Sequence, residues 1–399
     1  MAALPQARPS LSAALRRLVS ALGIGQIISW GTLFYSIAVL GPPMAHALGV
    51  SDVMLYGSFT AGLFVSGLAS PWVGRRIDRH GGRGVLAGGS VLGAVACVLL
   101  ATSVNGATML AGWLVAGVAM AACLYDPAFA TLFRASGASY RRAVTALTLF
   151  GGFASTVFWP LSQYLLEAHG WRFAFAVHAA LNAGVCLPLH LAFVPASDAQ
   201  RSAAQPAAPP APAAETRPET FAWLAGAFAL AAFLSSAISA HLVVLLAAGG
   251  LAARDAVLVG AMIGPMQVAG RVMEFAFSGR WPPLMVGTLA FGLLALALVV
   301  LSLVRGVWVV ALLFALLYGW ANGVMTIVRG TVPGVLFGSR DYGALLGRLA
   351  QPQFILKSFA PVAVTLLFTL DGSRRVALYG LAAAGLAALA AYRMAIRRP

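Results

Sequence analysis

The residues Gly74-Arg75-Arg76-Ile77-Asp78-Arg79-His80-Gly81-Gly82-Arg83 interrupt a long apolar stretch with a dense group of charges. Asp78 stands among four arginines there, in a chain of which only 9% of the residues are charged. The flanking apolar runs, Met54–Val73 and Gly84–Ser103, each approach the ~20 residues that an α-helix needs to cross a bilayer core of ~30 Å. Because the connection between them is short, the two helices are predicted to be antiparallel neighbours.

The composition of the whole chain points to a membrane. Hydrophobic residues make up 60% of the 399 residues and the mean hydropathy is +0.88. Globular proteins carry about 25% charged residues, and a water-soluble core of this size could not absorb so much apolar surface. The chain is therefore predicted to be an all-α, multi-pass membrane protein.

Twelve apolar runs can be counted, six on each side of a segment rich in Pro and Ala. The first six are Val19–Leu40, Met54–Val73, Gly84–Ser103, Ala107–Ala130, Ala143–Leu166 and Phe173–Val194. The last six are Phe221–Ala247, Ala256–Phe277, Leu284–Leu303, Val307–Val328, Ala344–Leu370 and Val376–Met394. The predicted organisation is an N-terminal arm (1–18), a six-helix bundle (19–194), a semi-extended linker (195–220), a second bundle (221–394) and a short tail (395–399).

The basic residues predict the topology. With the N-terminus inside, 19 arginines fall on the cytoplasmic side and 5 on the other, with Arg271 and Lys357 left inside apolar runs. This asymmetry follows the positive-inside rule, so both termini and the linker are predicted to be cytoplasmic. The net charge of +15 lies in loops between apolar runs, and we therefore expect membrane lipid rather than nucleic acid as the partner of these arginines.

The pattern G-x-x-x-D-R-x-G-x-R at 74–83 resembles the signature loop between the second and third helices of the major facilitator superfamily. Gly82 is a one-residue departure from the usual Gly-Arg, and Arg83 is in place. The run count, the topology and the central linker resemble the same family. Gly170-Trp171-Arg172 and the proline in run eleven look like its oxalate/formate and monocarboxylate branch.

The resemblance implies two pseudo-symmetric six-helix bundles around a midplane cavity and secondary transport by alternating access. It also implies a multi-pass protein of a bacterial cytoplasmic membrane that functions as a monomer, binds a small-molecule substrate and is not an enzyme. It assigns gating to the loop, together with an acid on run four, Asp126, that pairs with Arg79 or Arg83. The loop residues concerned are Gly74, Arg75, Asp78, Arg79, Gly81 and Arg83.

Arg271 and Lys357 are the cations that the pattern places near mid-membrane, where a charge costs at least ~2.5–3.5 kcal/mol. Two interpretations are open. In one, both cations hold an anionic substrate between them, as is implied by the resemblance to the oxalate-type relatives. In the other, Arg271 pairs with Glu274 on the same helix face and Lys357 binds backbone carbonyls. Glu274 and Asp126 are also candidates for carrying a coupling proton.

Four further polar or aromatic residues in apolar runs are candidates to line the cavity: Gln26, Trp30, His241 and Asn322. Gln26, Trp30 and Phe34 recur on one face of run one. Such residues also serve as contacts between helices, and both roles remain open. No metal-ligand spacing or catalytic motif is present, so no cofactor is expected, and Cys97, Cys123 and Cys186 are expected to be packing residues.

Two registers relate the halves. We prefer the register that gives runs two and eight similar lengths, which aligns Ser278-Gly279-Arg280 with Ile77-Asp78-Arg79. The other aligns Gly270-Arg271-x-x-Glu274 with Gly74-Arg75-x-x-Asp78.

Three functions fit these features. The first is transport of a small organic anion, by proton symport or anion exchange. The second is efflux of a drug-like or toxic solute, and the third, from another class, is a non-transporting membrane sensor.

The topology is testable with a reporter that is active only outside the cytoplasm. Fused after Arg217, the reporter should stay inactive because the linker is predicted to be cytoplasmic. A fusion after Arg305, on the predicted outer side, is the positive control. Strong activity after Arg217 would contradict the topology.

Overall fold

A computed structural model describes residues 11–196, 218–277, 280–338, 341–370 and 375–397. Its regular elements in these ranges are helices, two of which (η1 and η3) are π-helical. The first half consists of α1 (Ala13–Ser29), η1 (Trp30–Tyr35), α2 (Ser36–Leu48), α3 (Asp52–His80), α4 (Gly82–Ala101), α5 (Gly106–Cys123), α6 (Tyr125–Ser136), η2 (Gly137–Ser139), α7 (Tyr140–Gly152), α8 (Ala154–Leu181), η3 (Asn182–Cys186) and α9 (Leu187–Phe193). The second half consists of α11 (Pro218–Ala248), α12 (Ala253–Phe277), α13 (Pro283–Ser302), α14 (Trp308–Phe337), α15 (Tyr342–Leu370) and α16 (Arg375–Arg397).

Within the described residues, nine helical segments are long and apolar enough to cross a membrane. One of them, Gly106–Phe193, is 88 residues long and bends at several points, so nine is a number of segments and not of crossings. The membrane-helix fold is confirmed, and twelve crossings stay a prediction. Most of the predicted linker lies outside the described residues, but α11 already begins at Pro218, and α1 begins within the predicted arm, at Ala13.

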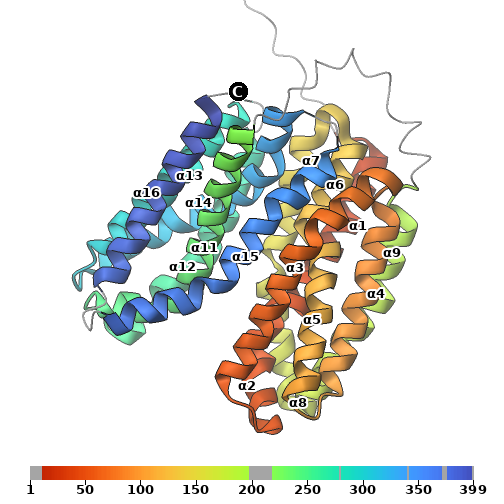
Figure 1. The fold of residues 1–399 in the computed structure, drawn as a ribbon, viewed down its shortest axis with the longest axis horizontal. Coiled ribbons are helices and arrows are strands. Elements are labelled where there is room, and N and C mark those ends of the chain that lie inside the picture. The colour runs from red at the N-terminus through yellow and green to blue at the C-terminus, as the bar shows by residue number, and fades with distance from the viewer. Residues whose placement is uncertain (1–10, 197–217, 278–279, 339–340, 371–374, 398–399) are drawn as a thin grey trace, which may run out of the picture.

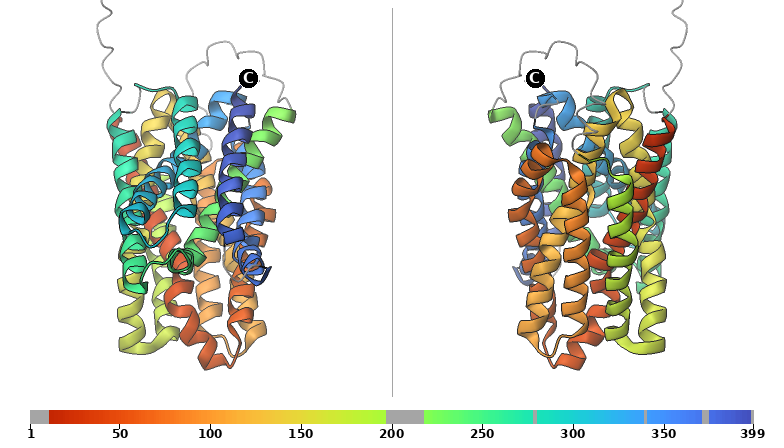
Figure 2. Two further views of the ribbon diagram at one scale, coloured as in Figure 1. Left: turned by 90° about the vertical axis from the view of Figure 1, so that its left-hand side faces the viewer. Right: turned by 90° about the vertical axis from the view of Figure 1, so that its right-hand side faces the viewer.

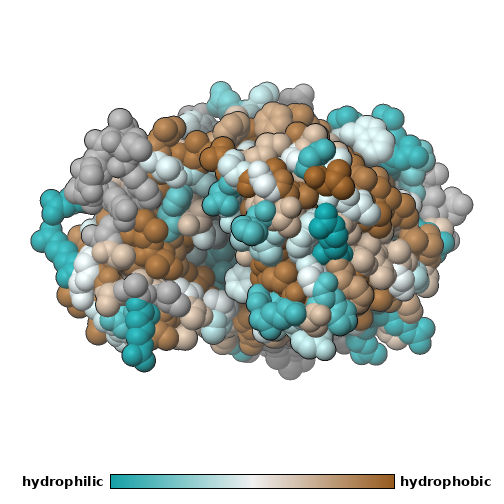
Figure 3. Space-filling view, turned by 90° about the horizontal axis from the view of Figure 1, so that it is seen from below, coloured by the Kyte–Doolittle hydropathy of each residue, from teal (hydrophilic) through white to brown (hydrophobic). Residues whose placement is uncertain are grey.

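The helices form two groups that lie side by side, α1–α9 and α11–α16 (Figure 1). The end of α9, the start of α11 and the end of α16 lie at the same end of the molecule, which we call the linker end (Figures 1 and 2). The groups touch mainly through α15 with α3 and α6, and through α7 with α12 and α14. Seen from the opposite end, the surface is hollowed between the groups (Figure 3).

Two of the predicted runs are not continuous helices. Run four breaks at Leu124, which is extended (φ −78°, ψ −157°) and separates α5 from α6. Pro127 explains this break, because its ring clashes with the carbonyl of Cys123 four residues earlier and it has no N–H to donate to that carbonyl. Run five divides into α7 and the first part of α8, and α8 turns at Gly170 (φ 84°) before the residues of run six.

Glycines let α3 and α15 pack backbone against backbone near the linker end. A Cβ on Gly74 would overlap the Gly343 carbonyl, and a Cβ on Gly347 would overlap the carbonyl of Ser70. At Gly67 a Cβ would lie 3.1 Å from the carbonyl oxygen of Gln351. Small residues allow such close approach between membrane helices, where dispersion contacts and hydrogen bonds replace the hydrophobic drive. The two halves are therefore closed on each other at the linker end.

Replacing Gly74 by Ala tests this closure. The added methyl group meets the Gly343 carbonyl, so we expect a shift toward states in which the linker end is open. The shift can be measured as faster alkylation of a cysteine that replaces Ser70, a buried residue of the same contact and close to cysteine in size. Gly84→Ala is the matched control, because nothing lies within 4 Å of a Cβ there. Equal alkylation rates in both variants would contradict the tight packing.

Candidate functional site

Lys357 lies on α15 and faces aromatic rings of the other half. Its Nζ is 4.1 Å from the ring centroid of Phe34 and 5.9 Å from that of Trp30. No carboxylate of the described chain lies within ion-pair distance of it. Pro352 and Pro361 flank the lysine in α15 and cannot donate helical N–H bonds, and this helix is bent (Figure 1). The ammonium thus sits on a bent helix, over the π faces of the first half.

The rings opposite Lys357 form a continuous wall. Trp30 contacts Phe34 and Tyr35 with centroid distances of 5.1 and 6.1 Å. The wall extends through Tyr35 to Trp159 at 5.9 Å and through Phe34 to Phe59 at 5.6 Å. Trp159 is 47% exposed, so the wall is accessible at that side. We call Trp30, Phe34, Tyr35, Phe59 and Trp159 the aromatic wall.

Arg271 of α12 does not pair with Glu274, and that prediction was wrong. The Arg271 side chain is buried, donates from Nη1 to the Thr148 carbonyl (3.2 Å) and donates from Nε to the Gly323 carbonyl (3.3 Å). Thr148 belongs to α7, so the arginine bridges the two halves. A Cβ on Gly152 would collide with the same Nη1, which shows how closely the guanidinium packs on α7.

Glu274 instead accepts hydrogen bonds from the first turns of α7. Arg141 donates to it from Nε (2.8 Å) and pairs with it through Nη2 (2.8 Å), and Thr145 donates from Oγ1 (2.6 Å). Arg141 also donates to the carbonyl of Trp281 (2.6 Å). Beside this ion pair is a cavity of about 170 Å³ lined by Arg141, Met273, Glu274, Phe277, Trp281, Val286, Leu289, Trp320 and Val324.

Asp78 of the signature loop binds the start of α15 in the other half. Its carboxylate accepts from the backbone N–H of Gly343 (2.9 Å) and of Ala344 (2.6 Å). The first N–H groups of a helix have no partner inside the helix and carry a partial positive charge, so a carboxylate is well placed there. The loop aspartate therefore fixes the start of α15 against α3.

Asp78 and Glu274 occupy corresponding places, because each lies on α3 or α12 and binds the first turns of a helix of the opposite half. This correspondence fits the register that aligns Asp78 with Glu274, and not the one that we preferred from run lengths. Ser278 and Gly279 of the preferred register lie outside the described residues. Glycine at position 279 has no carboxylate to offer, which is the physical reason that the contacts follow Glu274.

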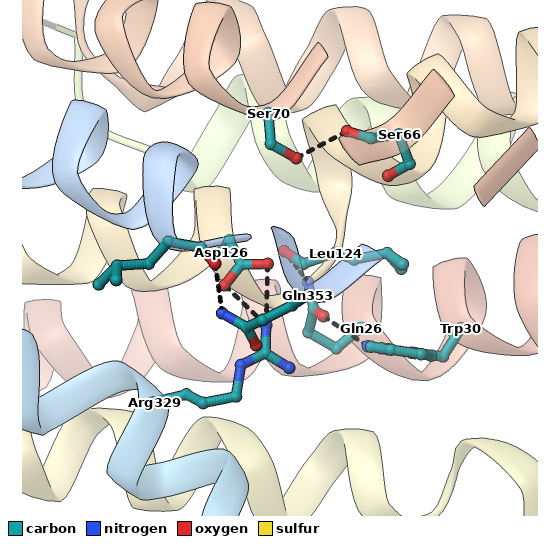
Figure 4. A network of polar contacts seen from close by, with 9 residues as sticks. Gln26, Trp30, Ser66, Ser70, Leu124, Asp126, Arg329 and Gln353 are labelled. Atoms are coloured by element: carbon teal, nitrogen blue, oxygen red, sulfur yellow. Dashed lines mark hydrogen bonds and ion pairs between the residues drawn. The ribbon is translucent and has the colours of Figure 1, made fainter. Parts of the chain in front are cut away.

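Asp126, in the first turn of α6, pairs with Arg329 of α14 (Figure 4). The Arg329 Nη2 donates to both carboxylate oxygens, at 3.0 and 3.1 Å. The expected partners, Arg79 or Arg83, were wrong. Arg79 is exposed, and Arg83 donates from Nε to the Val194 carbonyl of its own half (2.6 Å).

The remaining candidates are dispersed. Arg75 is exposed on α3, and Gly81 ends α3 with a positive φ of 79°. The Nε2 of His241 lies 2.9 Å from the Pro361 carbonyl, next to the bend of α15. Asn322 is half-buried on α14. The structure therefore does not bring these residues together around Lys357.

Gln26 is buried and all its polar atoms are used within the first half (Figure 4). Its Nε2 donates to the carbonyls of Cys123 (2.8 Å) and Leu124 (3.3 Å), and its Oε1 accepts from Nε1 of Trp30 (3.1 Å). Trp30 belongs to the aromatic wall, whereas Gln26 lies behind it.

Two tyrosines that the sequence did not single out meet at one carbonyl. Tyr140 of α7 and Tyr342 of α15 both donate to Gly330 of α14, at 2.6 and 2.7 Å. Phe133 stacks on Tyr342 with a centroid distance of 3.9 Å. Each tyrosine begins its helix, just ahead of predicted runs five and eleven. This matched placement in the two halves is the sequence feature that could have identified the pair.

In the parts of the chain that the structure covers, no group of His, Cys, Asp and Glu is arranged to hold a metal ion. Cys97, Cys123 and Cys186 are buried free thiols.

Comparison with known proteins adds the family and the fold. A family model described as the Major Facilitator Superfamily matches residues 22–349. The structure is similar to that of the human organic anion transporter MFSD10 (TETRAN), with a TM-score of 0.72 and 17% identity over 97% of this chain and 100% of that one. It is similar to a point variant of the E. coli fucose:proton symporter FucP, with a TM-score of 0.72 and 15% identity over 94% and 98% of the two chains. A FucP structure in the outward conformation gives 0.71 and 14%, with the same coverage. No curated protein matches the sequence. Identities this low indicate a shared fold and not a shared substrate.

The Asp126–Arg329 pair can be tested by neutralising its members singly and together. Either Asp126→Asn or Arg329→Gln leaves a partly buried charge without its partner. We expect each to lower the free energy of unfolding by about 1–3 kcal/mol, less than for a fully buried pair because both side chains are partly exposed. The double variant should recover at least half of that loss, measured by thermal unfolding in detergent. Arg79→Gln is the control at an exposed arginine. Additive losses in the double variant would contradict the pairing.

Proposed function

We infer that this chain, which belongs to the Major Facilitator Superfamily, is a transporter that moves a small organic anion across a membrane by alternating access. The observation that carries the proposal is Lys357, a cation over an aromatic wall and, in the described structure, without a carboxylate at ion-pair distance. Arg271, Glu274 and Asp126, the other charged residues that the sequence singles out inside apolar runs, all have polar partners in the structure.

An anionic ligand would neutralise the charge of Lys357 inside the protein. A cation inside a membrane costs at least ~2.5–3.5 kcal/mol, and a carboxylate that binds it offsets much of that cost. Arg271 is a candidate second partner for the anion. It donates only to neutral carbonyls, which bind a guanidinium less strongly than a carboxylate does, so a bound anion competes for it.

Alternating access is supported by how the halves are joined. At the linker end they meet through hydrogen bonds and ion pairs of Asp78, Glu274 and Asp126, each of which is individually breakable. At the opposite end the surface is hollowed between them (Figure 3). Rocking of two bundles around a central site interconverts this conformer with one open at the linker end. We propose that the linker end is cytoplasmic and that the membrane is the bacterial inner membrane, because the arginines concentrate at this end.

Coupling to a proton or to a second anion is part of the proposal. Glu274 and Asp126 both pair with arginines across the halves, so protonation of either would remove a bond that holds the linker end closed. Anion exchange needs no such proton and uses only the anion site at Lys357.

The aromatic wall favours a second candidate, efflux of a drug-like or toxic compound. Its rings offer stacking contact to flat apolar groups, worth about 0.5–1.5 kcal/mol per pair. Anion transport is preferred because stacking leaves Lys357 without an anion.

The proposal is tested with purified protein in proteoliposomes and a panel of labelled anions that includes oxalate, lactate and benzoate. At least one should accumulate or exchange, and a labelled lipophilic cation should not. Lys357→Gln should weaken binding of that anion by roughly 10- to 150-fold, the equivalent of ~1.5–3 kcal/mol for a hydrogen bond to a charged group. Lys357→Arg should be milder, whereas Arg271→Lys should lose more because a point charge cannot reproduce a two-pronged contact.

The double variant Glu274→Gln with Arg271→Gln distinguishes a role of Arg271 in binding the anion from a role in pairing with Glu274. The pair is not joined in the structure, so the double variant should transport no better than Arg271→Gln alone. Restored anion transport in the double variant would refute the role of Arg271 in binding, and transport of the cation in place of every anion would refute the anion proposal.

A further inference from the structure

The turn at Leu124 joins the gate to the rest of the first half. Asp126 lies in the first turn of α6, just after this turn, and pairs with Arg329 of the other half. The direction in which Asp126 points is therefore set by how α6 leaves α5. Leu124 keeps one backbone hydrogen bond to each helix, from its N–H to the Met120 carbonyl (3.2 Å) and from the Ala128 N–H to its own carbonyl (3.4 Å). These two bonds are fewer than a continuous helix would make here, so further contacts contribute to the direction of α6.

Pro127 leaves the Cys123 carbonyl, at the same place, without its usual helical donor. In a continuous helix, the Cys123 carbonyl would accept from the N–H of residue 127, and proline has none. A buried carbonyl without a partner is costly, so another donor has to take the place of that N–H. The donor is the side chain of Gln26, at 2.8 Å, which also reaches the Leu124 carbonyl at 3.3 Å.

The other end of the Gln26 amide contacts the aromatic wall. Its Oε1 accepts from the indole N–H of Trp30, and the Trp30 ring is 5.9 Å from Nζ of Lys357. The Trp30 ring also lies 5.2 Å from that of Tyr125, the first residue of α6. The Tyr125 hydroxyl in turn occupies the place that a Cβ of Gly151 would take on α7. One buried glutamine thus touches the wall beside Lys357 on one side and the turn before Asp126 on the other (Figure 4).

We propose that Gln26 is a positioning residue of the transport cycle, which holds the Leu124 turn so that Asp126 faces Arg329 and which connects this gate to Trp30 in the aromatic wall. This rests on the proposed function, since the wall matters only if a solute binds beside Lys357. Gln26 itself does not bind that solute, because its donors and its acceptor are occupied inside the first half. A movement of Trp30 on binding is transmitted through the amide to the two carbonyls, and from them to α6.

Two substitutions divide the Gln26 contacts. Gln26→Glu keeps an acceptor for the Trp30 N–H and loses the two amide N–H donors; as a buried carboxylic acid it has one O–H to donate, so at least one of the two carbonyl bonds is lost. Trp30→Phe keeps both carbonyl bonds and loses only the indole bond. Gln26→Leu removes all the contacts. Gln163→Leu is the control, because Gln163 is an exposed glutamine on α8 that bonds Glu167 on its own helix.

The experiment measures the distance across the linker end by pulsed electron paramagnetic resonance, with spin labels at Arg76→Cys and Val335→Cys. Both positions are exposed, on α3 and α14, and the native cysteines are buried and stay unlabelled. No substrate is added. The parent chain should show mainly one short distance, with the open state in the range of roughly 0.1–10% that minor conformers occupy.

Gln26→Glu and Gln26→Leu should raise the open fraction by about tenfold, within the roughly 5- to 150-fold that a lost buried hydrogen bond shifts an equilibrium, because the carbonyls that lose a donor belong to the turn that directs Asp126. Trp30→Phe leaves the Gln26 Oε1 unpaired and should lower the melting temperature, but it does not remove a bond to that turn. Trp30→Phe and Gln163→Leu should stay within about twofold of the parent, the scatter that independent changes of a few tenths of a kcal/mol produce. Asp126→Asn should also open the linker end. Because Gln26 acts through Asp126, Gln26→Glu with Asp126→Asn should open it no further than Asp126→Asn alone.

Unchanged distances in both Gln26 variants, with only a lower melting temperature, would overturn the proposal and leave Gln26 as a structural contact. Multiplied effects in the double variant, or opening by Trp30→Phe equal to that by Gln26→Glu, would overturn it as well. If Gln26→Leu fails to insert, the comparison of Gln26→Glu with Trp30→Phe decides alone. Since no anion is used, failure to transport any anion would count against the proposed function without changing these distances.

Discussion

A charged group inside an apolar bilayer has to find a partner within the protein, because lipid supplies none. In this chain the requirement is met across the two halves. Asp78 accepts from backbone N–H groups of α15, Glu274 accepts from Arg141 and Thr145 of α7, and Asp126 pairs with Arg329 of α14. The charges that the membrane makes costly are therefore the groups that hold the linker end closed. Hydrogen bonds and ion pairs of this kind can be exchanged for others, whereas a packed apolar interface would have to come apart as a whole.

Lys357 stands apart from this arrangement because its neighbours are rings. Cation–π contacts with Phe34 and Trp30 keep the ammonium in place without neutralising it. An anion would find there a positive charge beside the rings of the aromatic wall. The wall is not isolated from the gate, since Gln26 lies between Trp30 and the turn that carries Asp126. Binding and closure are joined through one buried side chain and a proline-induced break in run four.

Corresponding residues of the two halves match in position more closely than in the kind of group that they bind. Asp78 binds the backbone at the start of α15, where glycine and alanine leave the N–H groups accessible, whereas Glu274 binds side chains at the start of α7, where Arg141 and Thr145 stand. Tyr140 and Tyr342 begin these two helices and converge on the same carbonyl of Gly330. The matched placement of the two tyrosines is visible in the sequence, but their shared contact with Gly330 is not, because it joins three helices from both halves.

The sequence by itself determined the class of fold, the family and the location of the signature loop. Apolar runs of about 20 residues specify membrane helices whatever they pack against, and the loop at 74–83 carries its own pattern. It also identified Arg271, Lys357, Glu274 and Asp126, because a charge in an apolar run is visible without a structure. Only the tertiary structure decided their partners. Asp126 meets Arg329, and Glu274 meets Arg141, because α6 and α12 face the opposite half, and helical spacing within one run cannot predict a contact between residues more than a hundred positions apart. The role of Gln26 was hidden for the same reason, since the carbonyl that it binds becomes available only where Pro127 breaks the neighbouring helix.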